Sequence, residues 1–379
     1  MAAMVLLAEE GWAEQGDRLW LRAAGMAVAV WFACGLLRAL LYVGDRAAVE
    51  GWNTGRYELL AKCMRVGRRS QQVLAVSLFT PLRALDDDRG LAQRAALGSN
   101  TGALCTQPGW PLGEENFRHS RLAVEPDEQP EALLGRGFAQ VLGELVPVLG
   151  KLPQDRPLAL LLEVDSRLPE SVVEAVWQKA WFASGIHQSV TRVEGAGLMV
   201  VDQWLDQRIN DQALLLVIAA QVAPGELAGC AEAVTGVLFG NRLTQTTVEP
   251  MAFLHRPQQE DEPTPEGLIT AARQALDWVP VAGGKVQQVW ITACDAQRAQ
   301  ALALTLSGVC LPTDRKAAVH DLDGTIGNLG RSAPWLAIAA AVDGISADPQ
   351  PHFIFSGEPA ANGRLWCAAV MPSAIREDI

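Results

Sequence analysis

One stretch near the carboxyl end limits the fold more than any other part of the chain. Ser332–Val342 reads SAPWLAIAAAV and contains no charged residue. A serine at the start and a proline two residues later are typical of the first turn of a helix. A helix that is apolar on almost every side must be buried on most of its surface. The sequence therefore predicts a layered domain in which some helices lie between sheets.

Apolar strands alternate with apolar helices along the rest of the chain. Segments such as LALLLEV and ALLLVIAAQ are almost wholly apolar, which is typical of strands in a sheet covered on both faces. The predicted fold class is therefore α/β. The main predicted strands are Val73–Phe79, Leu158–Val164, Ser189–Val193, Ala213–Gln221, Val286–Ala293, His352–Phe355 and Leu365–Val370. Two further segments, Ala233–Phe239 and Thr247–Leu254, are predicted to pair with each other.

The amino-terminal segment, residues 1–48, contains an apolar run at Ala23–Gly44 whose only charge is Arg38. A helix of this length rises far enough, at about 1.5 Å per residue, to cross a bilayer core of about 30 Å. The basic residues lie mostly downstream of it, at Arg46, Arg56, Lys62, Arg65, Arg68 and Arg69. The positive-inside tendency predicts a single span in a bacterial inner membrane with the body in the cytoplasm. The alternative is an amphipathic or buried helix of a soluble cytoplasmic protein.

Composition excludes several classes of function. The net charge of −12 argues against nucleic acid as a partner. The seven cysteines are far apart, with no C-x-x-C and no zinc spacing with the five histidines, so we expect reduced thiols and no metal site. No phosphate-binding or hydrolase motif occurs, and we expect no cofactor.

The stretch HDLDGT, His320–Thr325, carries a D-x-D-G-T pattern similar to the nucleophile loop of haloacid-dehalogenase phosphatases. Such an enzyme also needs a later lysine and an acidic pair. Downstream of Asp321 there is no lysine, and the only adjacent acidic pair lies in the terminal tail. We therefore reject the phosphatase interpretation.

The continuation of this stretch, LDGTIGNLGRSAPWLAIAAAVDGI, resembles the third catalytic segment of ketosynthases of the thiolase-like superfamily. Three upstream segments resemble the others in order: Thr191–Val222, Cys230–Leu243 and Val286–Leu306. The resemblance implies a five-layered αβαβα body, divided into an amino-terminal half at 49–222 and a carboxy-terminal half at 223–379.

The same resemblance implies that the catalytic residues are lost. The nucleophilic cysteine aligns with Glu194, the two histidines align with Thr292 and Asn328, and the lysine aligns with Asp323. Claisen chemistry needs a thiolate to take the acyl group and imidazoles to stabilise the oxyanion. We therefore expect a degenerate site and no enzymatic activity of this kind.

Other roles for these residues stay open. Glu194 and Asp323 together could form a carboxylate pair for acid–base chemistry. More simply, Glu194 caps the following helix, Asp321 and Asp323 form Asx turns, and Asn328 adopts an unusual backbone angle.

Taken whole, the chain resembles the adaptors for lipase effectors encoded in type VI secretion gene clusters. The matching features are the apolar segment with its basic flank, VSLFTPL at Val76–Leu82, and WCAAVMPS at Trp366–Ser373. The resemblance implies a non-catalytic adaptor whose partners are a lipase-type toxin and a VgrG-type spike protein. Two alternatives stay open: an inactive ketosynthase-like partner subunit, paired through an apolar dimer face, and an enzyme acting on acyl thioesters with altered chemistry.

Overall fold

The computed structural model describes residues 16–87, 90–110, 115–279, 283–313, 318–357 and 363–373. The chain divides into two compact units, one ending at Arg65 and a body that begins at Val66.

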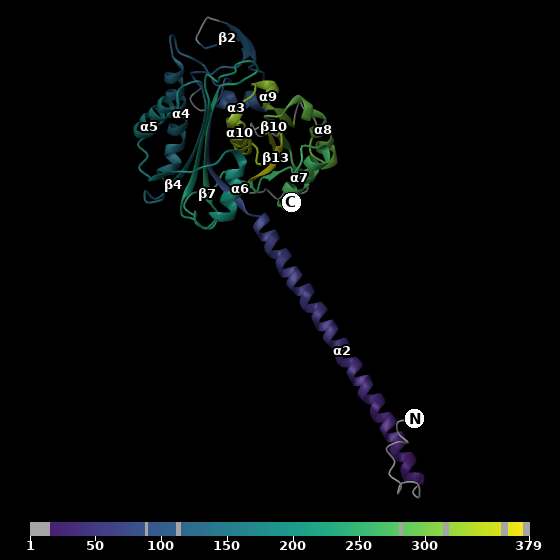
Figure 1. The fold of residues 1–379 in the computed structure, drawn as a ribbon. Coiled ribbons are helices and arrows are strands. Elements are labelled where there is room, and N and C mark those ends of the chain that lie inside the picture. The colour runs from purple at the N-terminus through teal and green to yellow at the C-terminus, as the bar shows by residue number, and fades with distance from the viewer. Residues whose placement is uncertain are drawn as a thin grey trace. The chain divides into compact units, whose positions relative to one another are not determined.

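The amino-terminal unit is formed by a single long helix, α2 (Gly16–Gly67) (Figure 1). The apolar run Ala23–Gly44 lies within it, as predicted, and its side chains are exposed. The predicted boundary between residues 48 and 49 falls inside this helix. Residues 1–15 of the predicted amino-terminal segment lie outside the described part of the chain.

By length and composition, two described helices could cross a membrane: α2 and α4 (Pro130–Leu149). The apolar side chains of α4, among them Leu134, Phe138 and Leu142, are buried in the body's hydrophobic core. Core packing therefore explains the apolar composition of α4, whereas no described residue of α2's own unit covers its apolar surface.

The body consists of two repeats with the same order of elements. The first repeat runs β1 (Ser70–Phe79), α4, β4 (Leu158–Asp165), α5 (Glu170–Ser184), β5 (Val190–Arg192), α6 (Gly197–Gln207), β6 (Leu214–Gln221) and β7 (Ala233–Asn241). The second runs β8 (Ala252–His255), α7 (Pro265–Asp277), β10 (Gln288–Thr292), α8 (Ala299–Gly308), β11 (Val319–Asp321), α10 (Ala333–Ala347), β12 (His352–Gly357) and β13 (Leu365–Pro372).

Strand pairing shows that the repeats share one topology. The strand order is β5-β4-β6-β7-β1 in the first repeat and β11-β10-β12-β13-β8 in the second. In each repeat the strand that closes the αβ series, β7 or β13, runs antiparallel to its neighbours. Antiparallel pairing of β1 with β8 joins the two halves into one continuous sheet.

The pairing corrects one prediction. The two segments expected to pair with each other overlap β7 and β8, yet β7 pairs with β1 and β6 while β8 pairs with β1 and β13. Because β7 completes the first set of strands, the first repeat extends to Asn241, past the division predicted at residues 222 and 223.

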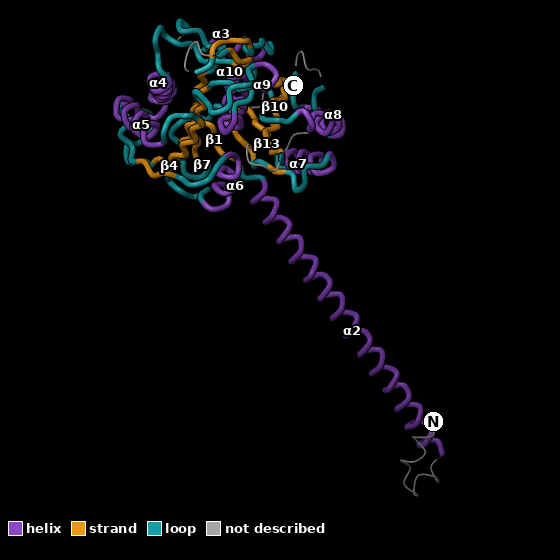
Figure 2. Tube along the Cα trace, turned by 45° about the horizontal axis from the view of Figure 1, so that its top comes forward, coloured by secondary structure: helices purple, strands orange, loops and turns teal. Residues whose placement is uncertain are grey.

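The helices form three layers around the two halves of the sheet (Figure 2). One outer core contains α4 and α5, the other contains α7 and α8, and the inner core contains α6 and α10. The predicted five-layered αβαβα, thiolase-like arrangement is therefore confirmed. The layers arise because successive side chains of a strand point to opposite faces of the sheet. In β6, Leu215 and Val217 lie in the inner core, whereas Leu216 and Ile218 lie in an outer one.

The uncharged segment Ser332–Val342 forms most of α10, and this helix lies in the inner layer as predicted. Its residues from Ala333 to Val342 are all buried. Five of them are alanines, whose short side chains let strands of both halves of the sheet approach the helix closely.

The remaining described elements are short. They are α3 (Leu91–Gly98), β2 (Cys105–Pro108), β3 (Asn116–His119), β9 (Gln258–Gln259), α9 (Leu322–Thr325) and three 3-10 turns at Gly283–Lys285, Ala296–Arg298 and Gly330–Ser332.

Candidate functional site

The candidate site is a cavity of about 790 Å³ where the parallel strands of both repeats end. Asp165 and Gln221 are the last residues of β4 and β6, and Ala293 and Gly357 lie at the ends of β10 and β12. The carboxyl ends of parallel strands are where open α/β sheets bind ligands. The fold thus brings two equivalent edges, one from each repeat, to a single cavity.

Asp323 links two segments of the cavity wall by hydrogen bonds. It lies in α9, directly after β11, and its carboxylate accepts the backbone N–H groups of Ala293 at 3.0 Å and Cys294 at 2.8 Å. The Thr292 hydroxyl lies 3.5 Å from the same carboxylate. Two of the predicted site residues, Thr292 and Asp323, therefore lie side by side. Burial raises the pKa of Asp323 to about 6, even though the two backbone donors favour the charged form.

The loop after β10 is under backbone constraint. Ala293 has a φ of 50°, in the left-handed region that L residues with side chains rarely adopt. Its carbonyl oxygen lies where a side chain on Gly357 would have to go, at 1.7 Å from an ideal Cβ. Asp323 and Gly357 together fix the direction of this loop. The Asx turn predicted for Asp323 is therefore replaced by hydrogen bonds to the loop after β10.

Asn328 also lines the cavity, on the loop that leads into α10. Its side-chain oxygen accepts the N–H of Gly330 at 2.8 Å, and its backbone pairs with residues 229–231. The left-handed backbone angles belong to its neighbours, with φ of 111° at Gly327 and 52° at Gly330. The explanation of Asn328 by an unusual backbone angle is therefore wrong, because this residue makes an Asx-type turn instead.

Glu194 lies apart from the other three. It is exposed, in the turn between β5 and α6, and is not among the described residues that line the cavity. It does not cap α6 either, because the N–H of Gly197 is donated to Glu163 at 3.1 Å. The predicted capping role is therefore wrong. The Asx turn predicted at Asp321 is replaced by a helix cap, since its carboxylate accepts the N–H of Gly324, three residues on, at 3.0 Å and so caps α9.

The cavity wall is rich in carboxylates: Asp165, Glu226, Asp295 and Asp323. Its arginine, Arg298, is paired with the buried Glu260 on the other side. Neither a histidine nor a lysine is among the described residues of the wall. Because like charges repel, such a wall disfavours anionic ligands, including the phosphate-bearing carriers of acyl groups.

Two thiols reach this cavity, Cys230 and Cys294. Burial, with nearby carboxylates, raises the pKa of both thiols, and that of Cys294 far above its usual range. A thiol is a useful nucleophile only as thiolate. Both cysteines are therefore held in their unreactive form. In the described part of the chain, no cluster of three or more potential ligands could hold a metal ion.

Sequence reasoning overlooked Glu163, which lies on β4 and is 5% exposed. Its carboxylate accepts the N–H of Gly197 and the indole N–H of Trp335, so it contacts the start of both inner helices. Burial raises the pKa of Glu163. The signal was present, because Glu163 is the one charge in the apolar strand LALLLEV.

Comparison with known proteins supports the fold but does not identify a family. No protein-family model matches the chain, and no curated protein matches it in sequence. Among solved structures, the ishigamide ketosynthase/chain length factor matches with a TM-score of 0.55 and 14% identity, over 80% of this chain and 99% of that one. A ketosynthase from module 1 of the bacillaene synthase of Bacillus amyloliquefaciens matches with a TM-score of 0.56 and 9% identity, over 83% and 75%.

A third similar structure is a ketosynthase solved in complex with a type II polyketide acyl-carrier protein. It matches with a TM-score of 0.51 and 10% identity, over 80% of this chain and 99% of that one. The TM-scores establish a shared thiolase-like fold. Because the sequence identities are low, the activity of this chain must be argued from its own residues.

Proposed function

We propose that this protein is a thiolase-like scaffold without condensing activity, which acts by binding another protein. The observation that carries the proposal is the chemistry of the cavity. Where a ketosynthase would need a thiolate and imidazoles, the described wall has carboxylates, two half-buried thiols with raised pKa values and no histidine. A wall of this kind offers no group that can take and hold an acyl chain.

The preferred role is that of a membrane-tethered adaptor. Helix α2 supplies the anchor, and the basic residues that follow its apolar part favour a cytoplasmic body. By its resemblance to the type VI secretion adaptors, the partners would be a lipase-type toxin and a VgrG-type spike protein. The acidic surface implied by the net charge of −12 would speed encounter with a basic patch on a partner.

The second candidate is an inactive partner subunit of a condensing enzyme. It is favoured by the similarity of fold to a ketosynthase/chain length factor and to ketosynthases. The acidic cavity wall counts against it as far as direct binding of an acyl carrier is concerned, because a carrier's prosthetic arm bears phosphate. A silent subunit that only shapes the pocket of an active partner would escape this objection.

The test is a pull-down with the full-length protein in lipid nanodiscs, against the products of genes that neighbour its own. Capture of a lipase-type toxin or a spike protein supports the adaptor. Capture of a ketosynthase or an acyl carrier supports the silent subunit. Capture of neither, together with acyl-thioester turnover that is lost in Asp323→Asn, would overturn both proposals in favour of an enzyme.

A further inference from the structure

A second cavity, of about 190 Å³, lies at the other end of the inner layer. Its walls come from α3, from the carboxyl half of α10 and from the starts of two strands, with Gln288 on β10 and His352 on β12. The candidate site above lies at the carboxyl ends of these same strands. The two cavities are therefore separate features of the body.

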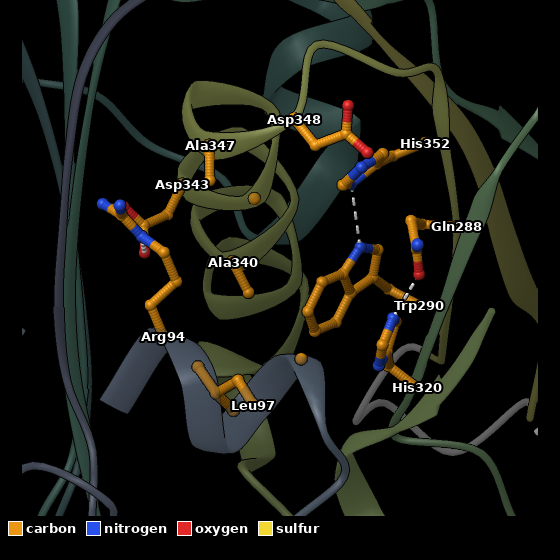
Figure 3. A pocket seen from close by; sticks show the side chains of 12 residues that line it. Arg94, Leu97, Gln288, Trp290, His320, Ala340, Asp343, Ala347, Asp348 and His352 are labelled. Carbon is orange, nitrogen blue, oxygen red and sulfur yellow. Dashed lines mark hydrogen bonds and ion pairs between the residues drawn. The ribbon is translucent and has the colours of Figure 1, made fainter. Parts of the chain in front are cut away.

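The space exists because α10 is narrow at this level. Ala340, Gly344 and Ala347 are spaced four and three residues apart, so they share one face of the helix, and all three line the cavity. Figure 3 shows Trp290 with its two histidine neighbours on one side and Ala340 and Ala347 on the other. A helix face without large side chains leaves the aromatic wall uncovered.

Hydrogen bonding fixes the state of one of the two histidines. The indole N–H of Trp290 points to Nδ1 of His352 at 3.1 Å. An indole N–H can only donate, so this nitrogen of His352 carries no proton and the ring is neutral, with its proton on Nε2. Burial lowers the pKa of His352 to about 3, which agrees with the geometry.

The second histidine, His320, stacks on the Trp290 ring with 4.2 Å between ring centroids. Its Nε2 lies 2.5 Å from the side-chain oxygen of Gln288. Burial lowers the pKa of His320 to about 4, so it too is uncharged at neutral pH. The arginine of the cavity, Arg94, forms an ion pair with Asp343. The interior is thus aromatic and uncharged on balance, while Asp348 at the rim is exposed.

We propose that this cavity binds a small uncharged aromatic molecule with a single ring or two fused rings and one hydrogen-bonding group. The size fits, because an apolar cavity of about 150 Å³ holds one benzene ring. The face of α10 and Leu97 would contact the ring, and the polar ends of Gln288 and His352 would orient its polar group. An anion would lose its hydration here and meet only Arg94, which is already paired with Asp343. This inference does not depend on the proposed function.

The test uses phenol and indole as probes, titrated into the full-length protein in nanodiscs and followed by ligand-observed NMR and by the thermal unfolding midpoint. We expect saturable binding by at least one probe. Ala340→Leu and Ala347→Leu place a large side chain in the cavity and should weaken binding at least tenfold. Ala347 is exposed at the rim, so Ala347→Leu stays informative if Ala340→Leu fails to fold.

The matched control is Ala299→Leu, the same change at an exposed position of α8 outside the cavity. This variant should bind the probes with the same affinity as the wild type. Because it is measured in the same nanodiscs, it also controls for partition of the probes into lipid. Absence of saturable binding for both probes would overturn the proposal. Equal binding by the folded Ala347→Leu variant and the control would do the same, since the probe would then be held elsewhere.

Discussion

Glu163 of the first repeat accepts a hydrogen bond from the indole N–H of Trp335 in the second. Its other carboxylate oxygen accepts the N–H of Gly197 at 3.1 Å, at the start of α6. One buried carboxylate therefore ties together the two inner helices that come from different repeats. The positive ends of both helix dipoles lie near it, which offsets part of the cost of burying a charge.

This contact predicts an unusual sensitivity at Glu163. Glu163→Ala leaves two buried donors without an acceptor, and each such group costs about 1–3 kcal/mol. We expect the variant to lose about 2–5 kcal/mol of unfolding free energy in urea titrations, whereas Glu163→Gln, which keeps one acceptor oxygen, should lose less.

The control for Glu163 is Glu174→Ala. Glu174 also forms a side-chain contact, an ion pair with Arg192, but both partners are more than 40% exposed. Exposed ion pairs contribute about 0–1 kcal/mol. Equal losses in Glu163→Ala and Glu174→Ala would show that the link between the inner helices does not stabilise the fold.

Asp323 should make stability depend on pH. Its pKa is about 6 in the folded protein, against about 3.9 for an unfolded aspartate. The folded state thus binds the proton more tightly, so this contribution is fully present below about pH 4 and is lost as pH rises through about 6. The difference corresponds to at most about 3 kcal/mol, less what solvent screens.

The measurement is the unfolding free energy at pH 4, 5, 6 and 7 for the wild type and Asp323→Asn. The variant should lose less stability than the wild type between pH 4 and 6. Asp155→Asn, in an exposed loop before β4, controls for the change in net charge. Parallel curves for the wild type and Asp323→Asn would show that the folded pKa of Asp323 is not raised.

The layers could be predicted because they follow from local composition. An uncharged helix such as Ser332–Val342 admits few environments other than a position between sheets, and its boundaries in the structure agree to within a few residues. The pairing of β7 and β8 could not be predicted in the same way. Each strand is apolar, and apolar composition does not identify the strand beside it.

The candidate site divides along similar lines. Asp323 and Asn328 follow a strand or precede a helix at fixed points of the topology, and both line one cavity. Thr292 is buried at the end of β10, with its hydroxyl 3.5 Å from the Asp323 carboxylate. The alignment places Glu194 at the position of the nucleophilic cysteine, yet its side chain is exposed in the turn between β5 and α6. The N–H of Gly197 at the start of α6 is instead accepted by Glu163 on β4. A contact between residues so far apart in the chain leaves no local pattern in the sequence.

The glycine at the end of β12 should tolerate no side chain. Gly357→Ala would place a Cβ at 1.7 Å from the carbonyl oxygen of Ala293. That contact can be relieved only by moving the backbone of the loop, and we expect a loss of more than about 2 kcal/mol. Gly143→Ala is the contrast: it lies inside α4, is exposed and has no atom within 4 Å of its Cβ. This exchange should stabilise the protein by about 0.5–1 kcal/mol.

The cysteines should differ sharply in reactivity. Burial and adjacent carboxylates keep Cys230 and Cys294 protonated, with pKa values raised, while Cys105 and Cys310 are exposed. Treatment with iodoacetamide at pH 7.5 should modify Cys105 and Cys310 within minutes and leave the other two unmodified in the folded protein, as read by peptide mass spectrometry. Rapid modification of Cys294 would contradict this and would revive covalent chemistry at the cavity.

The membrane topology can be tested with two cysteines of α2. Cys34 lies within the apolar run Ala23–Gly44, and Cys63 lies within the basic flank that follows this run. The test uses variants whose single cysteine is either Cys34 or Cys63. A membrane-impermeant maleimide should label Cys63 in inverted inner-membrane vesicles but not in intact cells. Cys34 should react with neither preparation until detergent is added, because the hydrocarbon core excludes the reagent. Labelling of Cys34 in untreated vesicles would show that α2 does not span the bilayer, and labelling of Cys63 in intact cells would reverse the orientation.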